Sequence, residues 1–358
     1  MKLITTGGGT GGHIYPAVSI ALAAMEEHPE ERVLFVGSSH GPEGEIARKA
    51  GLDFAAVPSS PMCKCCSVKT AKALFRLFCG FFRARKIIKG FDADAVVGTG
   101  GYTTAAVLLA ARTLRKYVVI HEQNVVAGKT NIWLSRIANK VCVTFDESVK
   151  YFPEKKVVHS GMPVRKEFFD LPDKTESRLK YGLDPNRFTI LVTGGSQGAK
   201  RLNELMSDAW DLIEDGNTQV LHQVGKKNIE EYRSAGSENY RYADYLDMPS
   251  ALAACDMVVC RSGASSLSEI FAAGRASVLF PYPYAYADHQ RFNAEFACRK
   301  GASVMFDDFK CTPEMLAETV RGIRGDKERR ESMALAAKSL SRPDAAHIVA
   351  GLACNRGK

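Results

Sequence analysis

The chain has 358 residues, of which 46% are hydrophobic and 25% are charged, and its formal net charge is +8. This length suits two domains better than one core, and the composition excludes a disordered or fibrous protein. No apolar run approaches the roughly 18–20 residues of a transmembrane helix, and no secretory signal precedes the first strand pattern. We therefore expect a cytosolic protein whose ten cysteines are reduced thiols rather than disulfides.

The first predicted strand runs into a loop with five glycines in six positions, residues 7–12, and a helix is predicted over residues 14–27. Glycines let the chain turn sharply and let a ligand approach the backbone, while the free amides and dipole of a helix start favour a diphosphate. His13 follows directly and places a titratable base beside this predicted phosphate site. A tight turn without a ligand is the alternative.

The same loop also fits the dinucleotide fingerprint, which requires an acid at the end of the second strand to hold a ribose. The second predicted strand, residues 32–36, instead runs into Gly-Ser-Ser. A nicotinamide oxidoreductase is therefore disfavoured.

A stretch without acidic residues, 54–91, carries eight cations, and its core at residues 74–89 has a helical pattern. Phenylalanines among cations are typical of a surface that dips into an anionic bilayer. The residues expected to contact a membrane are Leu74, Phe75, Phe78, Phe81, Phe82 and Arg85. In the alternative, these phenylalanines belong to the core and the cations to a solvated face. Nucleic-acid binding is disfavoured because no nucleic-acid motif accompanies the charge.

Two clusters in this half have the residue types of metal ligands. Three cysteines lie close together without a second ligand pair at zinc-like spacing: Cys63, Cys65 and Cys66. Asp92 and Asp94 form an Asp-x-Asp pair, but they precede a predicted strand, whereas ligands of open α/β sheets bind beyond the carboxyl ends of strands. We therefore predict no metal site.

Two polar turns follow later strands of the first half. The strand at 95–98 leads into a glycine turn that ends at Tyr102, and the strand at 117–120 delivers a polar run of His121, Glu122, Gln123 and Asn124. Such a run at the carboxyl end of a strand is where substrate groups are bound. A capped helix start is the alternative interpretation.

The organisation repeats in the second half of the chain. A strand at 188–193, a glycine turn at 194–198 and a helix at 199–212 match the opening of the chain in order. Two halves that begin in this way predict two doubly wound α/β domains that face each other across a cleft. The strand, glycine and proline of residues 157–165 indicate the crossing between them.

Two further polar segments lie beyond strands of the second half. The strand at 256–260 leads into a helix start at 261–269, where Glu269 lies one turn inside. A carboxylate at that depth accepts both hydroxyls of a ribose, although a capping acid is the alternative. A Tyr/Pro-rich loop later ends at Gln290 and Asn293, which are one helical turn apart.

Taken together, these motifs resemble the MurG family of peptidoglycan N-acetylglucosaminyltransferases. The matching pieces are Gly8–His13, Gly100–Tyr102, His121–Asn124, Gly194–Gly198, Arg261–Ala264, Ser268-Glu269 and His289–Ala294. The resemblance implies the GT-B architecture of two Rossmann-like domains facing across a cleft. It implies an acceptor- and membrane-facing domain at 1–162, a UDP-GlcNAc-binding domain at 163–341, and a C-terminal helix at 342–358 that returns to the first domain.

The resemblance also implies the reaction. An inverting displacement would move N-acetylglucosamine from UDP-GlcNAc to the C4 hydroxyl of MurNAc in undecaprenyl-pyrophosphoryl-MurNAc-pentapeptide, converting lipid I to lipid II. No cofactor and no protein-bound metal is implied. The implied partners are UDP-GlcNAc, lipid I and the anionic cytoplasmic face of the cell membrane, where the protein would be peripheral. Alternatives are a UDP-sugar 2-epimerase, a lipid A disaccharide synthase, or a membrane-docked nucleotide-sugar sensor without turnover.

Site residues follow from the matched positions. His13 is the candidate base, with His121 and Glu122 as alternatives. Glu269 would hold the ribose, Ser196 and Arg165 the diphosphate, and Gln290 and Asn124 the sugar. The full substrate-binding set implied is Thr10, Gly11, Gly12, Tyr102, Asn124, Arg165, Ser196, Gln197, Tyr245, Ala264, Ser265, Ser266, Leu267, Ser268, Glu269, Gln290 and Asn293. Tyr245 stands where the family usually has an aliphatic residue near the uracil.

Overall fold

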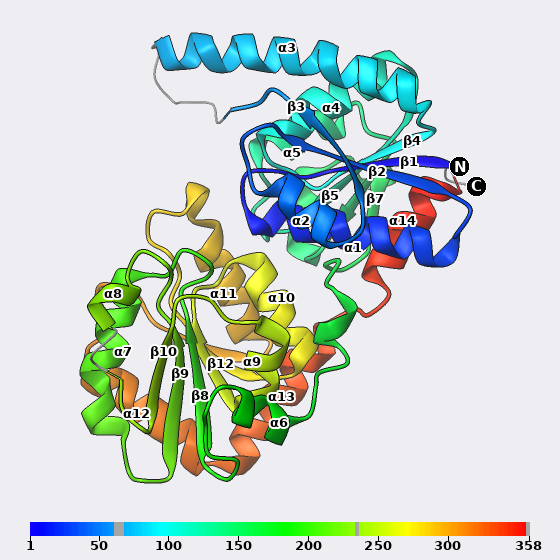
Figure 1. The fold of residues 1–358 in the computed structure, drawn as a ribbon. Coiled ribbons are helices and arrows are strands. Elements are labelled where there is room, and N and C mark those ends of the chain that lie inside the picture. Colours follow the sequence, from blue (N-terminus) through cyan, green and yellow to red (C-terminus); the bar gives the residue numbers. More distant parts are fainter. Residues whose placement is uncertain (61–67, 233–235, 356–358) are drawn as a thin grey trace. The chain divides into compact units, whose positions relative to one another are not determined.

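The structure, a computed structural model, describes residues 1–60, 68–232 and 236–355. The chain forms two compact units, of which the first is Met1–Arg165 with Arg342–Lys358 and the second is Lys166–Ser341. Each unit has one parallel sheet between helices (Figure 1), so the predicted class of two doubly wound α/β domains is confirmed. The clustered cysteines of the sequence lie outside the described residues: Cys63, Cys65 and Cys66.

The first unit contains a seven-stranded parallel sheet in the order β3-β2-β1-β4-β5-β6-β7. Its strands are β1 (Lys2–Thr6), β2 (Arg32–Ser38), β3 (Asp53–Val57), β4 (Ala95–Gly98), β5 (Tyr117–Glu122), β6 (Lys140–Val143) and β7 (Val157–His159). Its helices are α1 (Gly11–Glu27), α2 (Glu43–Lys49), α3 (Val68–Phe91), α4 (Tyr102–Thr113), α5 (Lys129–Ser135) and α14 (Ala345–Cys354), with 3-10 turns η1 (Asp146–Tyr151) and η2 (Glu154–Lys156).

Apolar side chains of this sheet alternate between two cores. Leu3 of β1 belongs to the core under α1 and α14, whereas Ile4 belongs to the core under α3, α4 and α5. Burial on both faces explains why the strands are near-continuous apolar runs in the sequence. The C-terminal helix α14 packs along α1, so the two ends of the chain belong to the same unit.

The second unit contains a six-stranded parallel sheet in the order β10-β9-β8-β11-β12-β13. Its strands are β8 (Phe188–Thr193), β9 (Thr218–Gln223), β10 (Tyr240–Ala243), β11 (Met257–Cys260), β12 (Ala276–Leu279) and β13 (Ser303–Met305). Its helices are α6 (Lys174–Lys180), α7 (Lys200–Ile213), α8 (Ile229–Tyr232), α9 (Met248–Ala254), α10 (Ala264–Ala273), α11 (His289–Arg299), α12 (Pro313–Gly325) and α13 (Lys327–Ser339), with 3-10 turns η3 (Lys166–Phe168) and η4 (Tyr286–Asp288).

Each sheet reverses its strand order at one point, between β1 and β4 in the first unit and between β8 and β11 in the second. Ligands of open α/β sheets bind beyond the carboxyl ends of the strands at such a switch point. The glycine turns that follow β1, β4 and β8, together with the polar turn after β11, all begin at these ends.

The helix α1 begins at Gly11, three residues earlier than the predicted start at residue 14. Glycine has a low helix propensity, which makes such a start hard to predict, and tertiary packing overrides it here. His13 is consequently part of the first helical turn, and its backbone amide donates to the Thr10 carbonyl over 3.0 Å.

Candidate active site

The turns that follow β1 and β4 in the first unit are packed directly against each other. The amide of Gly8 donates to the carbonyl of Gly100 over 3.3 Å. A Cβ on Gly7 would lie 2.3 Å from both the His13 carbonyl oxygen and the Thr99 hydroxyl, so no larger residue fits there. Glycine is therefore required by close packing as well as by ligand approach.

His13 is held by two hydrogen-bond acceptors. Its Nδ1 lies 3.0 Å from the Thr99 carbonyl oxygen and 3.2 Å from Gln123 Oε1. Because both partners accept, the neutral ring carries its proton on Nδ1 and its lone pair on Nε2, which is the form of a general base. Gly100 has φ +107°, and a Cβ there would come within 2.9 Å of His13 Nδ1. The glycine therefore makes room for the imidazole.

His121 lies close by but is fully buried. Burial lowers the pKa of its imidazole from 6.5 to about 4, and the nearby His13 acts in the same direction. Its Nε2 donates to the Gly161 carbonyl over 2.9 Å, and its Nδ1 lies 3.2 Å from Gln123 Nε2, which donates to it. Both ring nitrogens are thus used within the first unit.

Glu122 is also buried, and its carboxylate organises the loop that carries Asn124. One oxygen accepts from the Asn124 backbone amide over 3.0 Å and from its side chain over 3.3 Å. The other accepts from the Gly128 amide over 3.0 Å and from Asn131 Nδ2 over 2.8 Å. The dense polar run at the end of β5 therefore contains supporting side chains as well as one half-buried side chain, Asn124.

Glu43, for which the sequence pattern gave no signal, lies beneath the first glycine loop. It is the first residue of α2, it is fully buried, and its Oε1 accepts from the Gly9 amide over 3.0 Å. Its Oε2 has no hydrogen-bond partner among the described residues. A Cβ on Gly9 would lie 3.1 Å from the Tyr102 ring. Burial and then the Glu43 charge raise the pKa of the Tyr102 phenol.

Two more predicted residues belong to this unit. Thr10 is the N-cap of α1 and is exposed. The guanidinium of Arg165 lies 5.0 Å from the centre of the Tyr15 ring, two positions beyond His13 on α1. Asp92 and Asp94, for which the sequence predicts no metal, bind the N-terminal strand. Asp94 accepts from the Lys2 amide over 2.9 Å, and Asp92 pairs with the Lys2 ammonium over 3.4 Å.

In the second unit, the turn after β8 is anchored by Gln223. Its Nε2 donates to the Gly195 carbonyl over 3.0 Å, and its Oε1 accepts from the Leu246 amide over 2.8 Å. This one side chain ties the turn that presents Ser196 and Gln197, both exposed, to the segment that carries the exposed Tyr245. Nothing in the spacing of the sequence identified Gln223.

The start of α10 is the second polar centre of this unit. The Ser262 hydroxyl donates to the Gln290 carbonyl over 2.8 Å, and the buried Asn293 donates to the Ser262 carbonyl over 3.3 Å. Gln290 Oε1 accepts from the Tyr282 amide over 3.0 Å. The structure thus brings Ser262, two residues before the predicted 264–269 segment, together with Gln290 and Asn293.

The side chains of the 264–269 segment divide into two groups. Ala264, Leu267 and Ser268 are buried in the unit, whereas Ser265, Ser266 and Glu269 are half-buried. The preceding Arg261 anchors the segment through a buried ion pair with Asp308, with Nη1 and Oδ1 2.5 Å apart. The Leu267 amide donates to the Gly263 carbonyl over 3.0 Å at the start of the helix.

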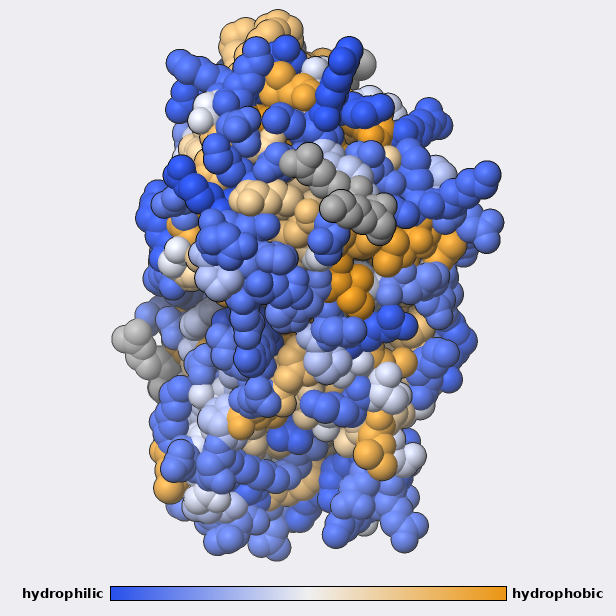
Figure 2. Space-filling view, turned by 90° about the vertical axis from the view of Figure 1, so that its right-hand side faces the viewer, coloured by the Kyte–Doolittle hydropathy of each residue, from blue (hydrophilic) through white to orange (hydrophobic). Residues whose placement is uncertain are grey.

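The predicted membrane residues lie on α3. Four of them are exposed, among which Phe75 is 68% exposed, whereas Phe81 packs against the core. Arg85 donates to Thr113 over 2.5 Å. Orange side chains appear among blue ones at the top of Figure 2, where Figure 1 places α3. None of the helices in the described ranges has the length and hydropathy needed to cross a bilayer.

Comparison with known proteins agrees with this geometry. Residues 3–143 match the glycosyltransferase family 28 N-terminal domain, and residues 189–349 match the glycosyltransferase family 28 C-terminal domain. The crystal structure of Acinetobacter baumannii MurG superposes with a TM-score of 0.75 at 28% identity, over 99% of each chain. The two domain matches therefore show a glycosyltransferase, and the parallel sheet in each unit agrees with the GT-B architecture.

One relative identifies the family. The UDP-N-acetylglucosamine–N-acetylmuramyl-(pentapeptide) pyrophosphoryl-undecaprenol N-acetylglucosamine transferase of Desulfitobacterium hafniense (strain Y51) is 38% identical over 356 residues, which cover 96% of each chain. The chain belongs to this family, the MurG N-acetylglucosaminyltransferases, as the sequence motifs predict. A putative UDP-N-acetylglucosamine 2-epimerase from Listeria monocytogenes has a TM-score of 0.74 at only 15% identity, over 98% of this chain and 95% of its own, and so shares the fold alone.

Proposed function

We propose that the chain transfers N-acetylglucosamine from UDP-GlcNAc to the C4 hydroxyl of MurNAc in undecaprenyl-pyrophosphoryl-MurNAc-pentapeptide, which converts lipid I into lipid II of peptidoglycan synthesis. The observation that carries this proposal is membership of the MurG family over nearly the whole chain. The polar turns at both switch points supply groups suited to a nucleotide sugar and a pyrophosphate.

The chemistry is a single inverting displacement. The acceptor C4 oxygen attacks the anomeric carbon of the donor sugar, the bond from that carbon to the β-phosphate oxygen breaks, and UDP leaves with the bonding electrons. The C4 hydroxyl proton goes to the base. We assign this role to His13, because its Nδ1–H is held by Thr99 and Gln123, which leaves the lone pair on Nε2.

The other two candidates for the base are better suited to support. Both nitrogens of His121 and both carboxylate oxygens of Glu122 already have protein partners. His121 is also a weak base, since burial lowers its pKa to about 4. We propose that they orient Gln123 and Asn124 rather than take the proton.

Donor binding is assigned to groups from both units. In the second unit, Glu269 serves the ribose, Ser196 the diphosphate and Gln290 the sugar. The backbone amides at the start of α10 add stabilisation for the charge that develops on UDP, and the helix dipole acts in the same direction. In the first unit, Arg165 serves the diphosphate and Asn124 the sugar.

Membrane attachment is assigned to α3 of the first unit. The exposed side chains Leu74, Phe75, Phe78 and Phe82 would enter the interface of the bilayer. Cations of the same helix would approach anionic headgroups, and each is worth about 1 kcal/mol near such a surface. Peripheral binding at the cytoplasmic face would bring the enzyme to a lipid-anchored acceptor.

Incubation of the full chain with UDP-GlcNAc and a short-chain lipid I analogue tests the reaction. We expect UDP and a β-1,4-linked disaccharide lipid in equal amounts. A 2-epimerase would instead convert UDP-GlcNAc to its 2-epimer without any acceptor. Consumption of UDP-GlcNAc that does not depend on the acceptor, or no disaccharide, would overturn the proposal.

A further inference from the structure

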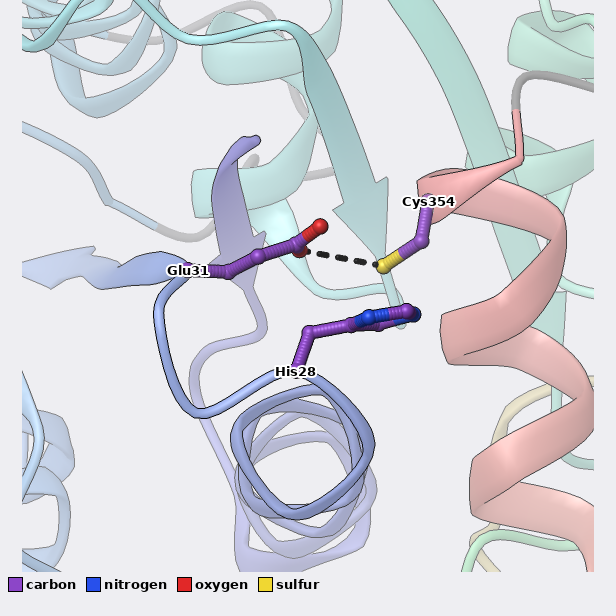
Figure 3. A group of neighbouring side chains, drawn as sticks. All are labelled: His28, Glu31 and Cys354. Carbon is purple, nitrogen blue, oxygen red and sulfur yellow. Dashed lines mark hydrogen bonds between the residues drawn. The ribbon is translucent and has the colours of Figure 1, made fainter.

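A cluster of three side chains lies at the edge of the first unit opposite the glycine loops. His28 follows the end of α1, Glu31 precedes β2, and Cys354 ends α14 (Figure 3). Their nitrogen, oxygen and sulfur atoms all lie within 4.8 Å of one another, and the Cys354 thiol contacts Glu31 Oε2 at 3.5 Å. The His28 side chain is 35% exposed and the Glu31 side chain 9%, while Cys354 is half-buried, so the cluster borders on solvent at His28.

The surroundings of the cluster are acidic. Glu27 and Glu30 flank it, and Glu30 lies 3.9 Å from the His28 ring. The Met1 amino group lies 3.6 Å from Glu31. A divalent cation would offset this negative charge and stabilise a thiolate.

We propose that His28, Glu31 and Cys354 bind a divalent transition-metal ion of the zinc class. Imidazole, carboxylate and thiolate are the three ligand types that Zn²⁺ prefers, and three protein ligands leave the fourth tetrahedral position to water. On binding, the thiol releases its proton to solvent and the sulfur donates to the metal. Bond lengths of about 2.0–2.3 Å require ligand atoms about 3.5 Å apart, so small side-chain rotations complete the site.

The position of the cluster indicates a structural role rather than a catalytic one. Glu31 precedes the amino end of β2, whereas the glycine loop follows the carboxyl end of the neighbouring β1. A strand of this length separates the two ends by about 15–20 Å. A bound metal would fasten the last turn of α14 to the α1–β2 turn, and would thereby stabilise the first unit without touching substrates.

Cobalt(II) is a suitable probe because thiolate ligation gives it a charge-transfer band in the near ultraviolet. The experiment uses the full chain with Cys63, Cys65 and Cys66 replaced by serine, since these clustered thiols would compete for the ion. We expect one Co²⁺ per chain with a thiolate band that Zn²⁺ abolishes by displacement. The band should disappear in Cys354→Ser and remain in the matched control Cys298→Ser, which removes another half-buried thiol.

A second variant covers the case in which Cys354→Ser does not fold. His28→Gln changes a side chain that is about one-third exposed, and it should weaken Zn²⁺ binding by at least the roughly 10- to 100-fold that the loss of an outer-shell partner typically causes. Zn²⁺ should raise the unfolding temperature of the chain with the three serine replacements, and it should raise it less when His28→Gln is added. A cobalt band that survives in Cys354→Ser, or Zn²⁺ stabilisation equal in both proteins, would overturn the proposal.

Discussion

Replacing Glu43 with glutamine tests whether a buried carboxylate organises the first glycine loop. Glu43 Oε1 accepts from the Gly9 amide over 3.0 Å, and the side chain is fully buried. Hydrogen bonds to charged groups contribute about 1.5–3 kcal/mol and neutral ones about half as much, so glutamine retains only part of this interaction. Its new amide group also replaces Oε2 where no described partner lies, and an unsatisfied buried donor costs about 1–3 kcal/mol.

Together the weakened hydrogen bond and the unsatisfied donor cost about 2–4 kcal/mol. Part of this cost lowers the free energy of unfolding, and part appears as a displaced glycine loop. Because about 1.4 kcal/mol corresponds to a factor of ten in rate, we expect kcat/KM to fall at least about tenfold. Glu45→Gln on the same helix is the matched control, because Glu45 is exposed and its pair with Lys49 lies at the surface. The assay is UDP release with a lipid I analogue.

The outcome is decided by comparison of the two variants. Both are first checked for folding by circular dichroism and by their unfolding temperatures. A Glu43→Gln enzyme whose kcat/KM lies within about twofold of the Glu45→Gln control would refute the claim that Glu43 is a positioning residue. Gly41→Ala gives an independent check, because its Cβ would lie 1.7 Å from Glu43 Oε2 and must displace the carboxylate.

Three further outcomes are expected. Phe75→Ser should weaken sedimentation with anionic vesicles about tenfold or more, whereas Phe309→Ser, a 64% exposed phenylalanine of the second unit, should not; equal effects would contradict the role of α3. Because burial lowers the pKa of His121 to about 4, the stability that this neutral imidazole contributes above pH 6.5 is lost as the pH falls toward 4. The free energy of unfolding should fall by up to about 1.4 kcal/mol per pH unit. Urea unfolding near pH 7 and pH 5 should show a smaller loss in His121→Gln than in the unmodified chain. Asp308→Asn leaves the buried Arg261 charge uncompensated and should lower the free energy of unfolding by about 3–5 kcal/mol in the same measurement, and an unchanged value would contradict the ion-pair assignment.

Features that depend on local pattern were predictable from the sequence. The apolar runs at 95–98 and 188–193 form buried strands because parallel strands are covered on both faces. The glycine turns after β1 and β8 lie at the carboxyl ends of strands, as the repeated strand–turn–helix order requires. The family assignment was also predictable, since its motifs occur in order along the chain.

Features that depend on contacts distant in sequence were not predictable. Glu43 reaches the Gly9 amide from 34 residues away, and Gln223 reaches Gly195 from 28 residues away. The sequence around His121 does not tell whether this side chain is buried or exposed, because a polar run after a strand is compatible with either. The same applies to Leu267 on α10, whose side chain faces the core.

The central claim, that His13 takes the acceptor proton during sugar transfer, is tested most directly in His13→Ala. The measurement is the single-turnover rate of disaccharide formation with saturating UDP-GlcNAc and a lipid I analogue, beside the equilibrium affinity for UDP-GlcNAc. We expect the rate to fall by about 10²–10⁴-fold while the donor affinity stays unchanged. A variant that forms the disaccharide at nearly the rate of the unmodified chain would contradict the assignment.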